Sequence, residues 1–166
     1  MRNVKLLAAA TILAVGASAA SAQNQFEMFA EVEGWKVWKD NEKGSCFIER
    51  RDEAGSVVQM GLTADKTLGY VGAFTQAETD IKDGEIQEIQ IIVGDHYYKG
   101  ESESMRGNLS NGYTGGYFMS PSAQLLEDIA KQYVMTIFPE TDYALEINLD
   151  GTLKATESAH ECNQTF

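Results

Sequence analysis

Short apolar runs, separated by turn residues, recur along most of this chain and constrain its fold more than any other feature. The runs are rich in β-branched and aromatic residues, and Gly, Asp or Asn separates them at 41–44, 53–55 and 83–84. The expected strands are 34–39, 46–50, 57–63, 68–75, 86–93, 96–98, 113–119, 134–138 and 143–149. Regularly spaced short strands favour an antiparallel β-sandwich or barrel-like sheet over alternating strands and helices. We therefore predict a mainly β fold, with α+β as the alternative, preceded by a polar lead-in at 23–31.

One amphipathic helix is expected among the later strands, and a second, short helix at the C-terminus. Ser120 suits the N-cap position, and Pro121 suits the first turn, where no backbone N–H is needed. Apolar side chains then recur at helical spacing on one face, which predicts a helix at about 121–133. The segment 152–162 predicts a short and weak terminal helix.

The N-terminus has the features of a cleavable export signal. Two basic residues precede an apolar run at 6–15 that is too short to span a bilayer, and Ala20-Ser21-Ala22 offers small residues for cleavage. We expect residues 1–22 to be a signal peptide and residues 23–166 to form one exported β-rich domain. The short, Ala-rich signal is typical of bacteria, so the predicted location is periplasmic or secreted. No second long apolar stretch follows, so no transmembrane anchor is expected after cleavage.

Cys46 and Cys162 are the two cysteines of the chain. An even number of cysteines in an exported protein favours a disulfide, which here would tie the terminal helix to the sheet. The bond would close a loop of about 116 residues and contribute about 4–5 kcal/mol in the entropic description. The alternative is a catalytic thiol assisted by His96 or His160, but proximity in sequence does not make a nucleophile–base pair.

The acidic composition and the missing motifs narrow the possible functions. A formal net charge of −12 repels nucleic-acid phosphates, so no nucleic-acid partner is expected. The sequence contains no zinc-binding, nucleophile-elbow, phosphate-loop or dinucleotide motif. We predict no catalytic residues, and an enzyme is the less favoured interpretation. The alternative is an envelope hydrolase, which needs two carboxyl groups close together in a pocket, one with a raised pKa.

The segment 146–157 resembles a calcium loop of the EF-hand type. The candidate calcium ligands are Glu146, Asn148, Asp150 and Glu157. Gly151 occupies the position of the sharp turn, but Glu stands where the motif has Asp, and residues 143–149 alternate like a half-buried strand. A strand ending in an Asp-Gly turn, with no cofactor, is the favoured interpretation, and a calcium-stabilised module is the alternative.

Aromatic residues suggest where a partner would bind. The candidate binding residues are Tyr97, Tyr98, Tyr113 and Tyr117. They lie near or within a Gly- and Asn-rich segment, 107–117, where tyrosines would offer large contact area at low entropic cost. The alternative is that the glycines mark hairpins and the tyrosines fill strand faces. Trp35 and Trp38 are three apart in an expected strand, so they would face opposite sides of the sheet.

A wider layout of short motifs resembles a known family. Gly34-Trp35-Lys36-Val37 is followed by Cys46, and the chain ends with Leu149-Asp150-Gly151-Thr152, Ala155 and Cys162. This layout resembles small exported alphaproteobacterial proteins of the invasion-associated locus B type. The resemblance implies a periplasmic β-sandwich-like protein associated with the envelope and host interaction. We therefore expect a non-catalytic soluble protein that binds another protein or envelope component, with an inhibitor of a cationic enzyme as a special case.

Overall fold

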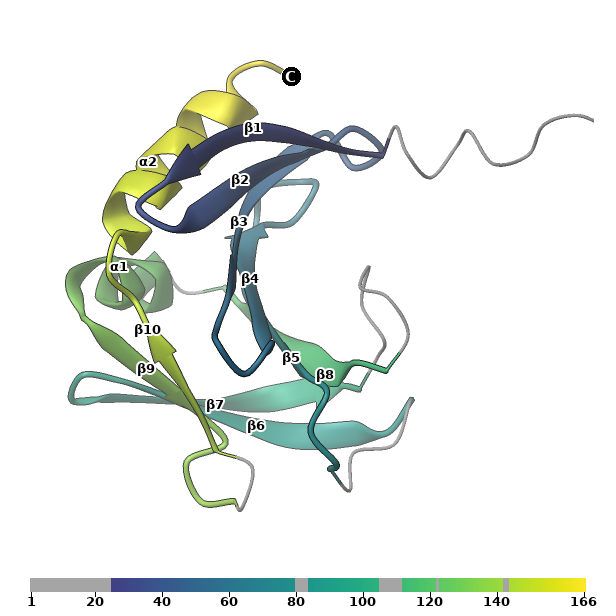
Figure 1. Cartoon of the computed structure of the whole chain (residues 1–166), viewed down its shortest axis with the longest axis vertical. Helices are drawn as coiled ribbons and strands as arrows, with labels where there is room; N and C mark the ends of the chain where they lie inside the picture. Colours follow the sequence, from purple (N-terminus) through teal and green to yellow (C-terminus); the bar gives the residue numbers. More distant parts are fainter. Residues whose placement is uncertain (1–24, 80–83, 105–111, 122, 142–143) are drawn as a thin grey trace, which may run out of the picture.

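The computed structural model describes residues 25–79, 84–104, 112–121, 123–141 and 144–166. The expected signal peptide lies outside these residues. The elements, in chain order, are β1 (Phe26–Val32), β2 (Trp35–Asp40), β3 (Ser45–Arg51), β4 (Val57–Leu62), β5 (Gly69–Thr75), β6 (Ile86–Val93), β7 (His96–Glu103), β8 (Thr114–Ser120), α1 (Ala123–Lys131), β9 (Val134–Ile137), β10 (Leu145–Asn148) and α2 (Thr152–Asn163). The fold is mainly β with two helices, one of them short and C-terminal, as predicted (Figure 1).

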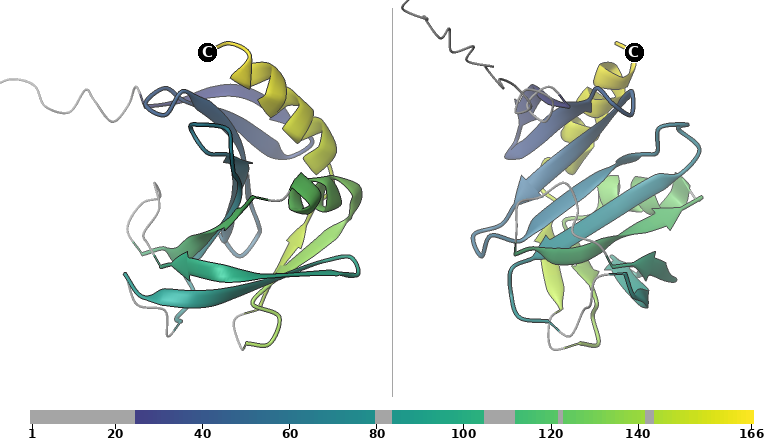
Figure 2. Two further views of the ribbon diagram at one scale, coloured as in Figure 1. Left: turned by 180° about the vertical axis from the view of Figure 1, so that it is seen from behind. Right: turned by 90° about the vertical axis from the view of Figure 1, so that its right-hand side faces the viewer.

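Two antiparallel sheets form the molecule. The first has six strands in the order β1-β2-β3-β4-β5-β8, and the second has four in the order β10-β9-β6-β7. The first five strands follow one another as neighbours, whereas β8 joins β5 after the β6–β7 hairpin. The six-stranded sheet curves strongly from β1 at the top of Figure 1 to β8 near the bottom. Its convex face is covered by the two helices and the second sheet, and its other face is concave (Figures 1 and 2).

The main core lies on the convex side of the six-stranded sheet. Alternate residues of its strands supply Trp35, Val37, Cys46, Ile48, Val58, Met60, Val71, Ala73 and Phe118. The second sheet and the helices supply Ile89, Ile91, Val93, Met135, Ile137, Leu125, Ile129, Ala155 and Ala159. Fully burying one large aliphatic side chain contributes about 1.5–3 kcal/mol, so this continuous cluster is the main source of stability. Side chains alternate between the two faces of each strand, so every second residue of these strands reaches the same core.

A disulfide and two side-chain hydrogen bonds fasten α2 to the sheet. Cys46 and Cys162 are bonded, with Cα atoms 6.1 Å apart, which confirms the predicted pair. Beside them Asn163 Oδ1 accepts a 2.9 Å bond from the Cys46 amide. At the start of the helix Trp35 Nε1 donates a 2.9 Å bond to the carbonyl of Asp150. The helix is therefore held at both ends.

Most strand ends lie within one or two residues of the expectations, but three expectations were wrong in a larger way. Residues 23–31 are not merely a polar lead-in, because Phe26–Val32 forms edge strand β1; its polarity reflects its exposure at a sheet edge. Strand β7 extends to Glu103 because it pairs along the whole length of β6, although its second half has few apolar residues. Ser120 is not the cap of a helix, because it ends β8 opposite Gly69. Helix α1 is accordingly shorter than 121–133.

Candidate functional site

The four tyrosines singled out in the sequence do not form one surface. Tyr97 is exposed on β7, and the Tyr98 hydroxyl donates to Asp128. Tyr113 is only 3% exposed and packs in a small apolar cluster with Val57 and Phe74, where its hydroxyl donates to the carbonyl of Gly55. Tyr117 lies on β8, on the concave face of the six-stranded sheet. Residues 107–111 of the Gly- and Asn-rich segment lie outside the described residues.

The segment 146–157 forms a strand, a turn and a helix. Glu146 lies exposed on β10, and Glu157 lies exposed on α2. Between them Asn148 Oδ1 accepts a 2.7 Å bond from the Asp150 amide, and Gly151 adopts a φ of +81°. No helix enters the loop, as the EF-hand arrangement requires. In the described part of the chain, no group of three or more His, Cys, Asp and Glu side chains is arranged to hold a metal ion.

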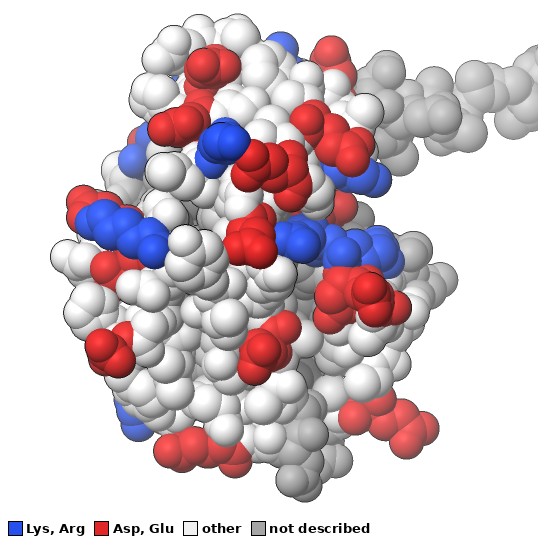
Figure 3. All heavy atoms as spheres, turned by 60° about the vertical axis from the view of Figure 1, so that its left-hand side comes forward, with Lys and Arg blue, Asp and Glu red and all other residues white. Residues whose placement is uncertain are grey.

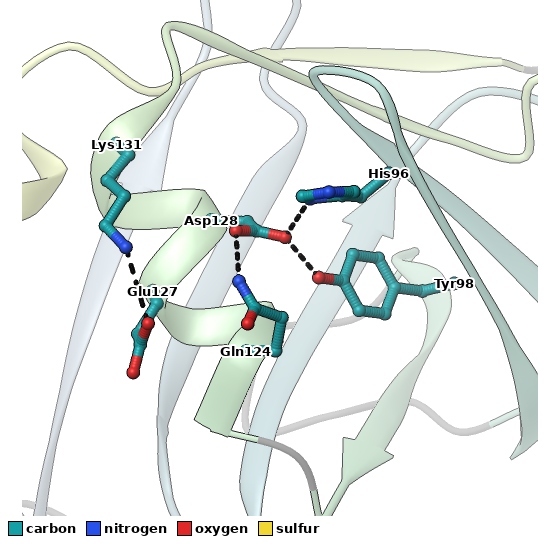
Figure 4. A network of polar contacts seen from close by, with 6 residues as sticks. All are labelled: His96, Tyr98, Gln124, Glu127, Asp128 and Lys131. Atoms are coloured by element: carbon teal, nitrogen blue, oxygen red, sulfur yellow. Dashed lines mark hydrogen bonds and ion pairs between the residues drawn. The ribbon is translucent and has the colours of Figure 1, made fainter.

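A buried carboxylate joins α1 to β7 (Figure 4). Asp128 is 5% exposed and accepts hydrogen bonds from the Tyr98 hydroxyl, from His96 Nδ1 and, at 2.6 Å, from Gln124. The Tyr98 bond is the largest cause of a lowered Asp128 pKa, with Gln124 and His96 adding to it. Among the described residues no serine, threonine or cysteine contacts His96, and both cysteines are bonded to each other. The catalytic-thiol alternative is therefore wrong, and the Asp128 network serves to fasten β7 to α1.

The concave face of the six-stranded sheet carries an unusual set of side chains. Strand register aligns one row across it as Trp38, Phe47, Gly61, Tyr70 and Met119. A neighbouring row consists of Lys36, Glu49, Gln59, Gly72 and Tyr117. Over these rows lies a hollow of about 400 Å³, which we call the concave hollow. Its lining residues are Asp40, Lys43, Ser45, Phe47, Gln59, Leu62, Thr63, Ala64, Tyr70, Tyr117 and Met119.

Three polar side chains lie almost fully buried in the concave hollow. Asp40, Ser45 and Gln59 are 2%, 4% and 3% exposed. Gln59 is satisfied at both ends, since it accepts a 2.7 Å bond from the Tyr117 hydroxyl and donates a 2.8 Å bond to Glu49. The Ser45 hydroxyl makes no hydrogen bond with any described residue. Buried polar groups normally have partners, so an unpaired hydroxyl beside a hollow is informative.

Asp40 uses one of its two carboxylate oxygens in hydrogen bonds within the described part of the chain. Its Oδ1 accepts two 3.1 Å bonds, from the backbone amides of Glu42 and Lys43. Its Oδ2 makes no hydrogen bond within the described part of the chain, and Lys43 Nζ lies 3.9 Å away on a side chain that is 58% exposed. A buried carboxylate is costly unless it is paired and hydrogen-bonded. One carboxylate oxygen in the concave hollow is therefore available to a further partner.

Aromatic rings form the walls of the concave hollow. The rings of Tyr70 and Tyr117 are 5.5 Å apart and nearly perpendicular, at 86°. Burial raises the pKa of Tyr70 well above its ordinary value, and the nearby charges of Tyr117 and Asp40 add to this. Burial also raises the pKa of Tyr117 to about 12, with Glu49 and Asp40 adding to it. The hydroxyls therefore stay neutral at neutral pH, and burial is the main cause for both rings.

Glycines make room for these rings. A Cβ added at Gly72 would lie 2.4 Å from Tyr117 Cε1, and one added at Gly61 would lie 2.9 Å from the Tyr70 hydroxyl oxygen. Neither glycine has a positive φ, so each is required by the close approach of a side chain. The tyrosines thus lie low over the strands.

Sequence reasoning identified only Tyr117 among the residues of the concave hollow. It did not identify Asp40, Ser45, Phe47 and Tyr70, although three other residues indicate a site in these strands. Gln59 is a polar residue inside an apolar strand, and Gly61 and Gly72 interrupt strands without ending them. Such residues in a strand interior often mark a place where another group approaches closely.

The hydrolase alternative requires a carboxyl group with a raised pKa. Three described carboxyl groups have clearly shifted pKa values, namely those of Asp65, Glu88 and Asp128, and hydrogen bonds lower all three. None of these three suits the acid of such an enzyme at neutral pH.

No helix in the described part of the chain is long and apolar enough to cross a membrane. In comparisons with known proteins, no family model, curated protein or solved structure matches this chain. A functional proposal therefore rests on the geometry of the concave hollow.

Proposed function

We propose that this chain is a non-catalytic binding protein and that the concave hollow holds a small component of the cell envelope or of a host. The observation that carries the proposal is the combination of aromatic walls with three buried polar side chains, Asp40, Ser45 and Gln59. Small-molecule sites are typically concave, mostly apolar, and equipped with a few fixed polar groups that provide specificity. A volume of about 400 Å³ lies within the usual range for such sites.

The rigidity of the surroundings supports binding at this place. The hollow lies on paired strands of one sheet, and the Glu49–Gln59–Tyr117 chain of hydrogen bonds fixes three of the side chains around it. Side chains held in this way lose little entropy when a ligand arrives. A second hollow of about 400 Å³ adjoins Phe74 of the Tyr113 cluster, but the Tyr113 hydroxyl beside it already bonds to the carbonyl of Gly55.

We also propose that the protein acts outside the cytoplasm, as the sequence predicts for residues 1–22. The disulfide between Cys46 and Cys162 supports this location, because such bonds persist in oxidising compartments. The resemblance to exported proteins of the invasion-associated locus B type points to the same compartment.

A blocking substitution tests the proposed site. Met119→Trp places a large ring at the edge of the concave hollow, where Met119 is 46% exposed. Leu153→Trp is the matched control, since Leu153 is 53% exposed on α2 and lines no part of the hollow. Binding of a panel of small amphipathic molecules would be followed through the indole N–H signals of Trp35 and Trp38 in NMR spectra.

We expect binders to shift the Trp38 signal, because Trp38 is paired with Phe47 on the same face. The Trp35 signal should change little, because Trp35 lies in the core and donates to Asp150. Met119→Trp should abolish the shifts and Leu153→Trp should preserve them. A panel that contains no binder for the hollow, or binding that survives Met119→Trp unchanged, would contradict the proposal.

A further inference from the structure

We infer that the ligand of the concave hollow is an organic cation, an amine or quaternary ammonium group carried on a small apolar body. This inference rests on the proposed function and specifies the class of ligand for the same site. It combines a buried carboxylate with one oxygen that makes no hydrogen bond within the described part of the chain, aromatic rings set at right angles and a hollow of matching size.

The carboxylate of Asp40 offers an acceptor for a cation. Its Oδ1 accepts the two backbone bonds of the turn, whereas Oδ2 makes no hydrogen bond within the described part of the chain and lies 3.9 Å from Lys43 Nζ. Lys43 is largely exposed, and exposed ion pairs contribute little to stability. A ligand cation can therefore take the place of Lys43 beside Oδ2 at small cost. It would pair with a charge that is already buried.

The aromatic walls of the concave hollow offer ring faces to a cation. Phe47, Tyr70 and Tyr117 line the same hollow as Asp40, and the last two stand nearly perpendicular to each other. Perpendicular rings make a corner in which a rounded ammonium group can contact more than one ring. Cations are attracted to ring faces, most strongly where water is excluded. A flat platform of parallel rings would instead suit a planar ligand.

The charges around the concave hollow also favour a positively charged ligand. Glu49 lies behind Gln59, and it adds negative potential at Tyr117. Lys43 is the one basic side chain among the described residues that line the hollow. Figure 3 shows the opposite, helix-bearing side of the molecule, where acidic side chains are also spread over the surface with basic ones between them. With a net charge of −12, the whole chain attracts cations toward its surface.

The test compares two probes of the same shape, choline and dimethylbutanol, the neutral alcohol in which carbon replaces the choline nitrogen. Each is titrated into the intact protein while the indole N–H signals of Trp38 and Trp35 are recorded. We expect choline to bind at least about tenfold more tightly than the alcohol, because only the cation gains from the rings and from Asp40. Equal affinity of the two probes would overturn the inference.

Two substitutions locate the effect. Asp40→Asn keeps an oxygen for the amides of Glu42 and Lys43 but removes the charge, so it should remove most of the preference for choline. The control is Asp52→Asn, because Asp52 likewise accepts a backbone bond, from Ser56 at 2.7 Å, in a turn away from the hollow. Asp52→Asn should leave choline binding unchanged. If the preference survives Asp40→Asn, the inference is wrong.

Lys43→Gln tests the class of ligand if Asp40→Asn fails to fold. It removes the competing ammonium, so choline should bind a few times more tightly and the alcohol should bind as before. Unchanged or weaker choline binding would overturn the inference. A hollow that binds the neutral alcohol as well as choline would leave the proposed function intact and refute only the ligand class. A hollow that binds neither probe refutes the ligand class, and the wider panel then decides the proposed function.

Discussion

The two faces of the six-stranded sheet come from the same strands but bury different chemistry. The convex face carries the main apolar core and is covered by two helices and a second sheet. The concave face buries Asp40, Ser45 and Gln59 among aromatic rings, and keeps a hollow. A strand alternates its side chains, so one sequence can build a core on one side and a site on the other.

The two tryptophans of β2 show the difference in one strand. Trp35 is fully buried on the convex face, and its Nε1 donates to the carbonyl of Asp150. Trp38 lies on the concave face, and its Nε1 is buried without a partner in the described part of the chain. Polar atoms on the convex side are matched to protein groups, whereas the concave side leaves some unmatched. That contrast is typical of a core beside a binding surface.

The largest expected effect comes from removing the disulfide that fastens α2 to the convex face. Replacing both Cys46 and Cys162 by Ala should lower the free energy of unfolding by about 4–5 kcal/mol, because the loop they close is long. This is a large part of the stability of an ordinary domain. Denaturant unfolding of the variant and of the parent measures the change. A loss below about 1 kcal/mol would show that the packing of α2 suffices without the bond.

Neighbouring residues of β3 then compare the two faces directly. Ile48 is 2% exposed on the convex face, and Ile48→Ala should cost about 2–5 kcal/mol because it leaves a dry cavity. Phe47 is 7% exposed on the concave face, and Phe47→Ala should cost less than the usual cost for a core Phe, about 3–5 kcal/mol, because water can enter the enlarged hollow. Unfolding in denaturant measures both. Equal costs, or a larger cost for Phe47→Ala, would show that the concave face is as tightly closed as the core.

The hydrogen bonds of Asp128 lie between α1 and β7, away from the six-stranded sheet, and their contribution to stability depends on pH. Hydrogen bonds lower the folded-state pKa of Asp128, so the stabilisation is present above the ordinary pKa of 3.8 and is lost as the pH falls through the folded-state value. Asp128→Asn should therefore be less stable than the parent at pH 7, and the gap should shrink below about pH 4. Thermal unfolding across this range measures the gap, with Glu127→Gln as the exposed neighbouring control. A gap that is constant with pH would contradict the assignment.

The smallest expected effect belongs to the concave face at alkaline pH. The folded-state pKa of Tyr117 is raised to about 12 from an ordinary value of 10.0, so its contribution is complete below pH 10 and is lost as the pH rises toward 12. Tyr117→Phe cannot ionise, so it should lose less stability between pH 9 and pH 11 than the parent does. Ultraviolet titration of the phenols, with unfolding measured at both pH values, checks this. The parent should keep more un-ionised tyrosine at pH 11 than the unfolded chain, and an identical titration would contradict the burial of this ring.

The sequence predicted much of the fold because that part depends on local patterns. Residues 86–93 formed the expected strand without change, and 152–162 became a helix that ends one residue later. The wrong predictions concern segments whose local sequence favours one structure while tertiary pairing imposes another. β1 lacked a buried face to reveal it, and Ser120 suited a helix cap but was recruited into pairing with Gly69.

The candidate site was far less predictable. Tyr97, Tyr98, Tyr113 and Tyr117 looked alike in sequence, but the fold dispersed them to different surroundings, and only Tyr117 lines the concave hollow. Asp40 and Tyr70 are thirty residues apart and belong to strands that are not direct neighbours. Their meeting depends on sheet order and curvature, which no local pattern specifies.

Local patterns are enough to predict the β-rich class, the positions of most strands and the disulfide, because alternation, turn residues and cysteine count are properties of short segments or of composition. Only the tertiary structure decided which side of the six-stranded sheet became a core and which became a hollow. Both sides of β3 and β4 are apolar enough to be buried, and the helices and the second sheet can cover only one of them. The uncovered side, where Trp38 Nε1 is buried without a partner among the described residues, is the side on which we propose that a ligand binds.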